Sequence, residues 1–173
     1  GTAADETLQG FGGNDSLSGG DGNDPLAGGD GDDNLAGGTG NDRLTTTLNL
    51  DYESLVTAAS AQQSGGSGND ILTLGISMEG PENASVTASL LGGDGEDRIT
   101  STLTLIASGQ TGTVTISGGR GDDTIDATAS SDGAPYGGAF TNDISGDDGD
   151  DIITTSVDTA FSGGGQTATN RID

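Results

Sequence analysis

Apolar residues recur along this chain at two spacings. In residues 1–45 a leucine returns every nine residues, and a run of Gly, Asn, Asp and similar polar residues precedes most of these leucines. Further on, apolar and polar residues alternate, as in Leu72–Met78 and Val86–Leu90. An alternation with a period of two is typical of a β-strand that buries one face. The sequence therefore predicts an all-β protein.

The repeat that carries these leucines has two lengths. Five consecutive nonapeptides fill residues 1–45: GTAADETLQ, GFGGNDSLS, GGDGNDPLA, GGDGDDNLA and GGTGNDRLT. The same signature returns at Gly65, Gly92, Gly118 and Gly146, so that from Gly37 the intervals are 28, 27, 26 and 28 residues. Each long repeat holds two alternating apolar runs with a variable, turn-rich segment between them. We therefore divide one domain, residues 1–173, into tandem nonapeptides (1–36) and five long repeats (37–173).

This division predicts a right-handed parallel β-roll, or β-solenoid. Each long repeat forms one coil, in the order acidic turn, strand, variable turn and returning strand, and each coil buries its inner residues only against its neighbours. The nonapeptides pair into two 18-residue coils, which are followed by five wider coils of 26–28 residues. We expect the extra length to bulge at the variable turn. Residues 58–64 (AASAQQS) fit the returning strand of the first wide coil poorly.

The composition shows that such a fold needs a further component. The chain has 28 acidic residues against four arginines, a formal net charge of -24, 29% apolar residues and 34 glycines. Chains of low hydrophobicity and high charge do not offset the entropy of ordering by burial alone. The chain is thus either a flexible acidic spacer or a fold that a cation completes, and the inward apolar series favour the second. The negative charge also argues against nucleic acid and anionic membrane surfaces as partners. No apolar run approaches the roughly 18 residues that a membrane helix needs, which argues against membrane insertion.

The acidic turn has the chemistry of a calcium site. Calcium takes six to eight oxygen ligands at about 2.3–2.6 Å. One turn offers too few, but two turns stacked about 4.8 Å apart can hold an ion between them. The repeated aspartate then supplies a carboxylate from each turn. These predicted ligands are Asp15, Asp24, Asp33, Asp42, Asp70, Asp97, Asp123 and Asp151.

The motif GGxGxDxUx, in which U is a large apolar residue, resembles the RTX, or hemolysin-type, calcium-binding repeat of secreted bacterial proteins. The resemblance implies that carbonyl groups of the turn glycines, and of the residue between them, complete the calcium shell. The glycines at these positions are Gly13, Gly20, Gly22, Gly29, Gly31, Gly38, Gly40, Gly66, Gly68, Gly93, Gly95, Gly119, Gly121 and Gly149.

The coil lengths also predict which turns share an ion. In 18-residue coils alternate nonapeptides lie on the same side, so Asp24 pairs with Asp42, and Asp15 pairs with Asp33. From Asp42 onward the motifs come once per coil and form a single column. We expect about six calcium ions, with a weak seventh site where Glu6 replaces the aspartate.

Two other activities were weighed against this interpretation. Adjacent acids such as Asp32–Asp33 resemble glycosidase carboxylates, but they lie inside the calcium motif, and a chain without His, Cys or Lys lacks the usual bases and nucleophiles. We therefore predict that the chain is not an enzyme. Outward rows of threonine, such as Thr45, Thr73 and Thr100, are explained by β-propensity, with an ice-binding face as the alternative.

The sequence as a whole predicts a calcium-dependent structural module of a secreted or cell-surface bacterial protein, of adhesin, filament or surface-layer type. We expect type I secretion, folding on extracellular calcium, and contacts with further copies through uncapped ends. The alternative is an accessory module of a secreted RTX enzyme that aids folding or binds extracellular polysaccharide.

Overall fold

The computed structural model describes residues 1–51, 57–132, 138–160 and 167–172, and these form β-strands and turns. No helix of the described residues is long and apolar enough to cross a membrane. The strands are β1 (Leu8–Gly12), β2 (Ser16–Asp21), β3 (Pro25–Asp30), β4 (Asp33–Thr39), β5 (Arg43–Leu50), β6 (Ala58–Ser67), β7 (Ile71–Met78), β8 (Ser85–Asp94), β9 (Arg98–Leu105), β10 (Thr111–Arg120), β11 (Thr124–Asp132), β12 (Ala139–Asp148), β13 (Ile152–Ala160) and β14 (Thr167–Ile172).

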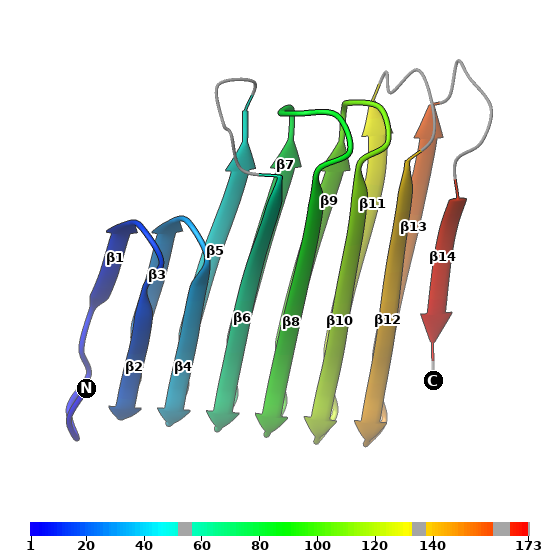
Figure 1. Ribbon diagram of the computed structural model, residues 1–173. Helices are drawn as coiled ribbons and strands as arrows, with labels where there is room; N and C mark the ends of the chain where they lie inside the picture. The colour runs from blue at the N-terminus through cyan, green and yellow to red at the C-terminus, as the bar shows by residue number, and fades with distance from the viewer. Residues whose placement is uncertain (52–56, 133–137, 161–166, 173) are drawn as a thin grey trace.

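The strands form two seven-stranded parallel sheets. The odd-numbered strands make one sheet in the order β1-β3-β5-β7-β9-β11-β13, which we call sheet A, and the even-numbered strands make the other, sheet B. The chain passes from one sheet to the other after every strand, so each pair of strands is one coil (Figure 1). The architecture is a parallel β-solenoid, as the sequence predicted.

The register of the strands reproduces the predicted coil lengths. Leu8 pairs with Leu26 and Leu26 with Leu44, each a step of 18 residues. Leu44 then pairs with Leu72, and Leu72 with Ile99, at the spacing of the long repeats. Two narrow coils are therefore followed by five wide ones, and the change of width is visible between β4 and β6 in Figure 1.

The core is a set of apolar rows that run along the stack between the two sheets. In sheet A, Leu44, Leu72, Ile99 and Ile125 are in register and have no exposed surface. Most of the alternating residues predicted to point inward are buried or packed against this core, but Ile172 of β14, the edge strand of sheet B, is 49% exposed. Burying one such side chain stabilises a fold by about 1.5–3 kcal/mol, and here each contact needs the next coil to be in place.

Strand β6 forms although its sequence lacks the expected apolar residues. Gln63 takes the place of a leucine between Leu35 and Leu90 in the inward row of sheet B, and only 2% of its surface is exposed. Its amide Nε2 donates to Thr46 Oγ1 and to the Thr73 carbonyl, both at 3.0 Å. A hydrogen-bonded amide thus replaces apolar packing at this position, which the alternation rule did not foresee.

The narrow and wide coils are joined by longer strands as well as by a longer turn. β3 has six residues and β4 has seven, whereas β5 has eight and β6 has ten. We expected the extra length to bulge at the variable turn. Part of it instead lengthens the strands, because the added residues continue the parallel ladder with β7 and β8. The wide coils extend beyond the narrow ones and leave a step between β4 and β6.

Candidate metal centre

Each acidic turn begins at the carboxyl end of one strand and leads into a strand of the other sheet. We number the turn residues 1 to 6 in the motif GGxGxD. Residues 2 and 4 adopt positive φ, as at Gly66 (119°) and Gly68 (123°). Two turns keep this conformation without glycine at residue 2, where Phe11 has a φ of 74° and Asp147 a φ of 69°. All fourteen glycines predicted to line the sites have positive φ.

The motif aspartates form two columns. The long column contains Asp24, Asp42, Asp70, Asp97, Asp123 and Asp151, at the lower ends of the sheet B strands in Figure 1, and the short column contains Asp15 and Asp33. The pairs Asp24–Asp42 and Asp15–Asp33 are brought together as predicted. Glu6 continues the long column, because its backbone N–H donates to Asp24 Oδ1 at 2.7 Å.

One carboxylate oxygen of each paired aspartate holds the coils together. The backbone N–H of Asp42 donates to Asp70 Oδ1 at 2.7 Å, and that of Asp70 donates to Asp97 Oδ1 at 2.8 Å. The same bond joins Asp97 to Asp123 and Asp123 to Asp151. The side chain of each coil therefore reaches back to the backbone of the preceding coil, which fixes the carboxylate in the space between two turns.

The second carboxylate oxygen, Oδ2, is buried and has no hydrogen-bond partner in seven of these aspartates. The seven are Asp15, Asp24, Asp33, Asp42, Asp70, Asp97 and Asp123. Asp70 and Asp123 are each only 1% exposed. A buried carboxylate without a partner is strongly unfavourable, so the structure calls for a cation at these oxygens.

Glycine at residue 1 of the turn makes room for this oxygen, a role that the sequence interpretation missed. A Cβ placed on Gly65 would lie 2.3 Å from Asp70 Oδ2 and 2.6 Å from the carbonyl oxygen of Gly92 in the next coil. At five other residue-1 glycines the same point lies close to both the motif aspartate Oδ2 and the carbonyl oxygen of residue 1 in the next turn. These glycines are Gly10, Gly19, Gly37, Gly92 and Gly118. The available signal was that residue 1 is glycine in all eight full motifs, whereas residue 2 is not.

Residue 5 of the turn forms a second ladder that was also missed. The backbone N–H of Asn41 donates to Asn23 Oδ1, and that of Asn69 donates to Asn41 Oδ1, at 2.7 and 2.8 Å. These side chains reach toward the next coil, in the direction opposite to the motif aspartates. The recurrent Asn-Asp pair was the signal for this ladder. Together with the motif aspartates, which reach to the preceding coil, this ladder fixes each turn against both of its neighbours.

The turn carbonyls of one coil point at the turn of the next coil. The carbonyl oxygen of Gly40 points toward Gly68 in the next coil. A Cβ placed on Gly68 would lie 2.0 Å from this oxygen. The carbonyl of residue 3 already accepts a backbone bond, for example from Gly40 N–H to Ser67 O at 2.7 Å. Among the described residues no three acidic side chains converge, so backbone oxygens would supply most of any shell.

Burial changes the acidity of these carboxyl groups. Loss of solvent raises the pKa of Asp70 to about 7 and that of Asp97 to about 6, with repulsion from neighbouring aspartates adding to the rise and a backbone hydrogen bond opposing it. The pKa values of Asp33, Asp42 and Asp123 are raised by the same main cause. At neutral pH the ionised form of these groups thus needs a compensating charge.

We predict that protonation of the buried aspartates at low pH partly replaces the stabilising effect of the cation. An aspartate has a pKa of about 4 in an unfolded chain, so between about pH 4 and pH 7 the native form of Asp70 binds more protons than the unfolded form. The calcium-free protein should therefore lose stability as the pH rises through this interval. Far-UV circular dichroism in a calcium-free buffer should show more β-structure at pH 4.5 than at pH 8. Equal signals at the two pH values would contradict the assigned burial.

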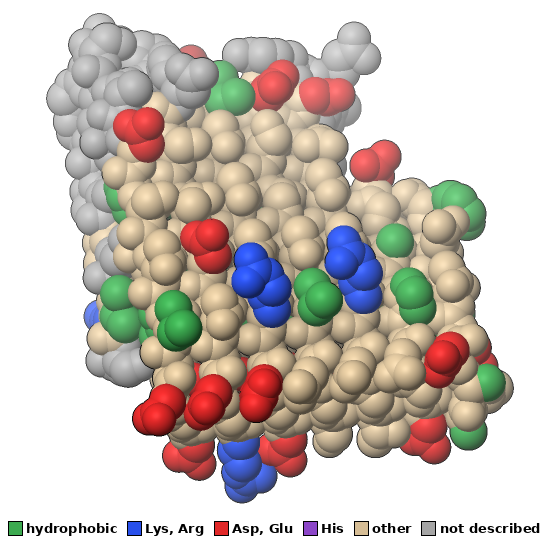
Figure 2. Space-filling view, turned by 180° about the vertical axis from the view of Figure 1, so that it is seen from behind, with side chains coloured by type: hydrophobic (Ala, Val, Ile, Leu, Met, Phe, Trp, Pro, Cys, Tyr) green, Lys and Arg blue, Asp and Glu red, His purple; other side chains and the backbone are tan. Residues whose placement is uncertain are grey.

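The other predicted surface feature, the rows of threonine, is present on sheet A. Thr45, Thr73 and Thr100 are in register, and Asp126 interrupts the row. Figure 2 shows this side of the molecule, where charged side chains are sparse over the strands and acidic ones gather along the edge formed by the turns.

The donor set fits calcium. It consists of oxygen atoms only, with one buried, unpartnered carboxylate oxygen per turn and carbonyls from the adjoining turn, which is the mixture that calcium prefers. Four stretches of the chain match a profile of the RTX calcium-binding nonapeptide repeat, residues 1–33, 9–44, 64–76 and 106–133. Comparisons with curated proteins and with solved structures gave no match.

The turns of Asp97 and Asp151 lie outside the matched stretches, yet they have the same hydrogen bonds and the same positive φ at residue 4 as the others. The geometry of the matched turns therefore continues in turns that the repeat profile does not match. The chain therefore carries RTX calcium-binding nonapeptide repeats.

Proposed function

We propose that this chain is a non-enzymatic structural module of a secreted or cell-surface protein, and that extracellular calcium folds it. The observation that carries the proposal is the set of seven buried carboxylate oxygens without partners. RTX repeats are typical of secreted bacterial proteins, which supports an extracellular setting. An adhesin, filament or surface-layer protein exported by type I secretion fits this setting.

Electrostatic repulsion explains why the chain would fold only when calcium is bound. At a formal net charge of -24 the chain repels itself, and the turns concentrate that charge in two columns. Six pairs of motif carboxylate and next-turn carbonyl suggest six ions, which would halve the net charge. Because calcium binds only the stacked turns, its binding free energy becomes folding free energy.

An accessory module of a secreted RTX enzyme is the second candidate. The surface offers little to an anionic polysaccharide without bridging calcium, since the chain has only four arginines against 28 acidic residues. Two of the four, Arg120 and Arg171, lie beside Asp94 and Asp143 at 3.1 and 3.7 Å. An ice-binding face is a weaker candidate, because Asp126 and Gly75 break the threonine rows.

Sedimentation velocity during a calcium titration from a chelated start tests the proposal. We expect a slow, extended species without calcium and a faster, compact species at millimolar calcium. Growth to larger assemblies would support self-association of the coils, and a compact monomer would favour a spacer or accessory module. An unchanged sedimentation coefficient at millimolar calcium would overturn the proposal.

A further inference from the structure

The two columns of turns end differently. The long column continues through the wide coils, but the short column ends at Asp33, because the wide coils carry a variable turn on that side. Asp33 is 3% exposed and its Oδ2 has no partner. At Gly10 the Asp15 carboxylate is joined by the carbonyl of Gly28 from the next turn, whereas the three atoms nearest the equivalent point at Gly28 all belong to Asp33. The same holds for Asp151 at Gly146, in the last described turn of the long column. The last turn of the short column therefore has half of a calcium shell.

The chain that follows this turn moves away from it. Ser60 N–H donates to Asp32 Oδ1 at 2.7 Å, and Ala61 pairs with Asp33, so β6 keeps the stacking register at residues 5 and 6 of the turn. Before Ser60, however, β6 runs as an extended strand beside β8 and does not form a turn over residues 1 to 4. Among the described residues no following turn covers Gly31, which itself stacks on the carbonyl of Gly13 in the preceding coil.

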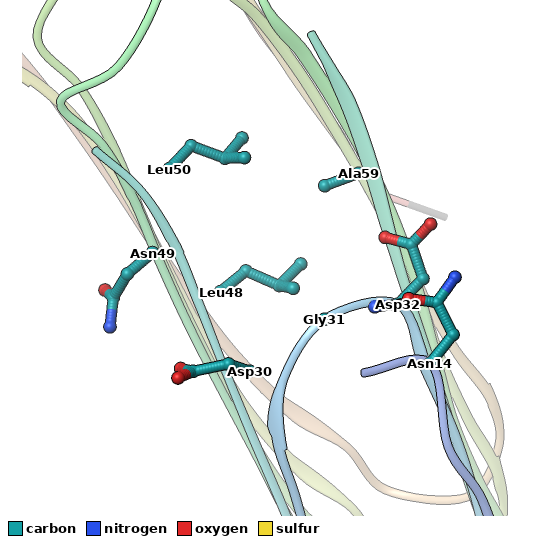
Figure 3. Close-up of a pocket in the computed structure, with 8 residues that line it drawn as sticks. All are labelled: Asn14, Asp30, Gly31, Asp32, Leu48, Asn49, Leu50 and Ala59. Carbon is teal, nitrogen blue, oxygen red and sulfur yellow. Dashed lines mark hydrogen bonds between the residues drawn. The ribbon is translucent and has the colours of Figure 1, made fainter. Parts of the chain in front are cut away.

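A pocket of about 360 Å³ lies at this place, on the step between the narrow and wide coils. Its polar side is formed by Asn14 of the first short-column turn and by Gly31 and Asp32 of the second, which are adjacent in the chain to the buried Asp33. Its apolar side is formed by Leu48 and Leu50 of β5 and by the β6 residue Ala59 (Figure 3). The pocket thus joins the open face of a calcium-binding turn to an apolar wall.

We propose that the turn of Asp33 binds a calcium ion whose remaining coordination positions open into this pocket and take the vicinal hydroxyl groups of a sugar or polyol. The proposal rests on the proposed function, since it needs calcium in the stacked turns. Calcium takes six to eight ligands and one turn supplies about half of them, so roughly three or four positions remain for water or a ligand.

Charge and shape select a neutral hydroxyl ligand. The carboxylates of Asp32 and Asp33 already match the charge of one divalent ion, and Asp30 adds a further negative charge at the pocket. An anionic ligand would be repelled there. Hydroxyl groups can coordinate the ion and donate hydrogen bonds to the flanking carboxylates, while the carbon face of a sugar ring packs on Leu48 and Leu50.

Luminescence of bound Tb³⁺, used in place of calcium, tests this inference on the full chain. The difference between lifetimes in H₂O and D₂O counts the water molecules on each ion. We expect one minor class of ions with several waters, and sorbitol, whose flexible vicinal hydroxyls suit many geometries, should lengthen its lifetime by displacing water. 1,4-Butanediol, which lacks vicinal hydroxyls, should have no such effect.

Two variants assign the minor class. Asp33→Asn keeps the Oδ1 that accepts from Asp15 N–H at 3.0 Å but removes the charge, so the sorbitol-sensitive ions should disappear while the ordered β-signal remains. Asp126→Asn removes a carboxylate from β11, outside both columns of turns, and should leave them in place. A sorbitol response that persists in Asp33→Asn, or its absence in the wild type with normal calcium-induced folding, would overturn the inference. Absence of calcium-induced folding would instead overturn the proposed function.

Discussion

Replacing Gly65 with alanine should raise the calcium concentration needed for half-maximal folding by about tenfold or more. The new methyl group would lie 2.3 Å from Asp70 Oδ2 and 2.6 Å from the carbonyl oxygen of Gly92. The Asp70 carboxylate is held through its Oδ1 by Asp42 N–H, and the Gly92 carbonyl is part of the backbone, so neither atom moves away freely. Forcing an extra methyl group into a packed site costs about 1–3 kcal/mol. The methyl group would occupy space that the carboxylate and the ion require, so calcium binding bears this cost.

Gly75→Ala is the matched control. Gly75 lies in β7 on the outer face of sheet A, and a Cβ at this position meets no atom within 4 Å. We expect this variant to fold at the same calcium concentration as the wild type or at a slightly lower one, because alanine reduces the entropy of the unfolded chain. Calcium titrations followed by far-UV circular dichroism compare the two. Equal midpoints for Gly65→Ala and Gly75→Ala would show that residue 1 does not contribute to the site.

Replacing Asp70 with asparagine should have opposite effects with and without calcium. Asparagine keeps the Oδ1 acceptor for Asp42 N–H, which donates to it at 2.7 Å, and removes the negative charge. With calcium present, two adjoining sites lose a carboxylate, and we expect the folding midpoint to rise by at least about tenfold, equivalent to about 1.4 kcal/mol. Without calcium, the same change removes an unpaired buried charge and should stabilise the coils.

The calcium-free half of this prediction can be measured with an osmolyte. Trimethylamine oxide favours compact states because it is excluded from the protein surface. Burial raises the pKa of Asp70 to about 7, so at pH 8 the wild type carries a charge there that asparagine does not. The osmolyte concentration that induces β-structure in a chelated sample should therefore be lower for Asp70→Asn. A higher concentration would mean that Asp70 stabilises the coils by a route independent of calcium.

The sequence predicted the features that repeat. The spacing of Leu44, Leu72 and Ile99 predicted the coil lengths, and the alternation after each motif predicted the inward face. The paired aspartates followed from the same spacing, since 18 residues make a full coil in the nonapeptide region. Periodicity is strong evidence here because each coil repeats the environment of the preceding one.

Features that occur once or that depend on exact contacts were not predicted. Gln63 breaks the apolar row, and its burial is explained only by the hydrogen bond to Thr46 across the core. The steric role of Gly65 depends on a carbonyl from the next coil, which no pattern within one motif reveals. The pocket at the step exists because two coil widths meet, and neither width alone implies it.

The motif assigns separate tasks to its residues. The glycines at residues 2 and 4 provide the left-handed backbone, the glycine at residue 1 leaves space for a carboxylate, and residue 5 aligns the next turn. The aspartate then uses one oxygen for the backbone and keeps the other free. Phe11 and Asp147 carry a side chain at residue 2 with φ values of 74° and 69°. The glycines at this position are more restricted, since a Cβ on Gly66, at a φ of 119°, would lie 2.1 Å from the carbonyl oxygen of Gly38 in the preceding coil.

The most direct test of a calcium-completed fold is far-UV circular dichroism of the same sample in excess chelator and after calcium is added back, at pH 7.5 with magnesium as the control. We predict an unfolded spectrum in chelator, a β-sheet spectrum at millimolar calcium, and no recovery with magnesium, which is smaller, demands near-octahedral geometry and gives up its water ligands reluctantly. A β-sheet spectrum that persists in chelator at pH 7.5 would contradict the account, because the buried carboxylates would then be stable without a cation.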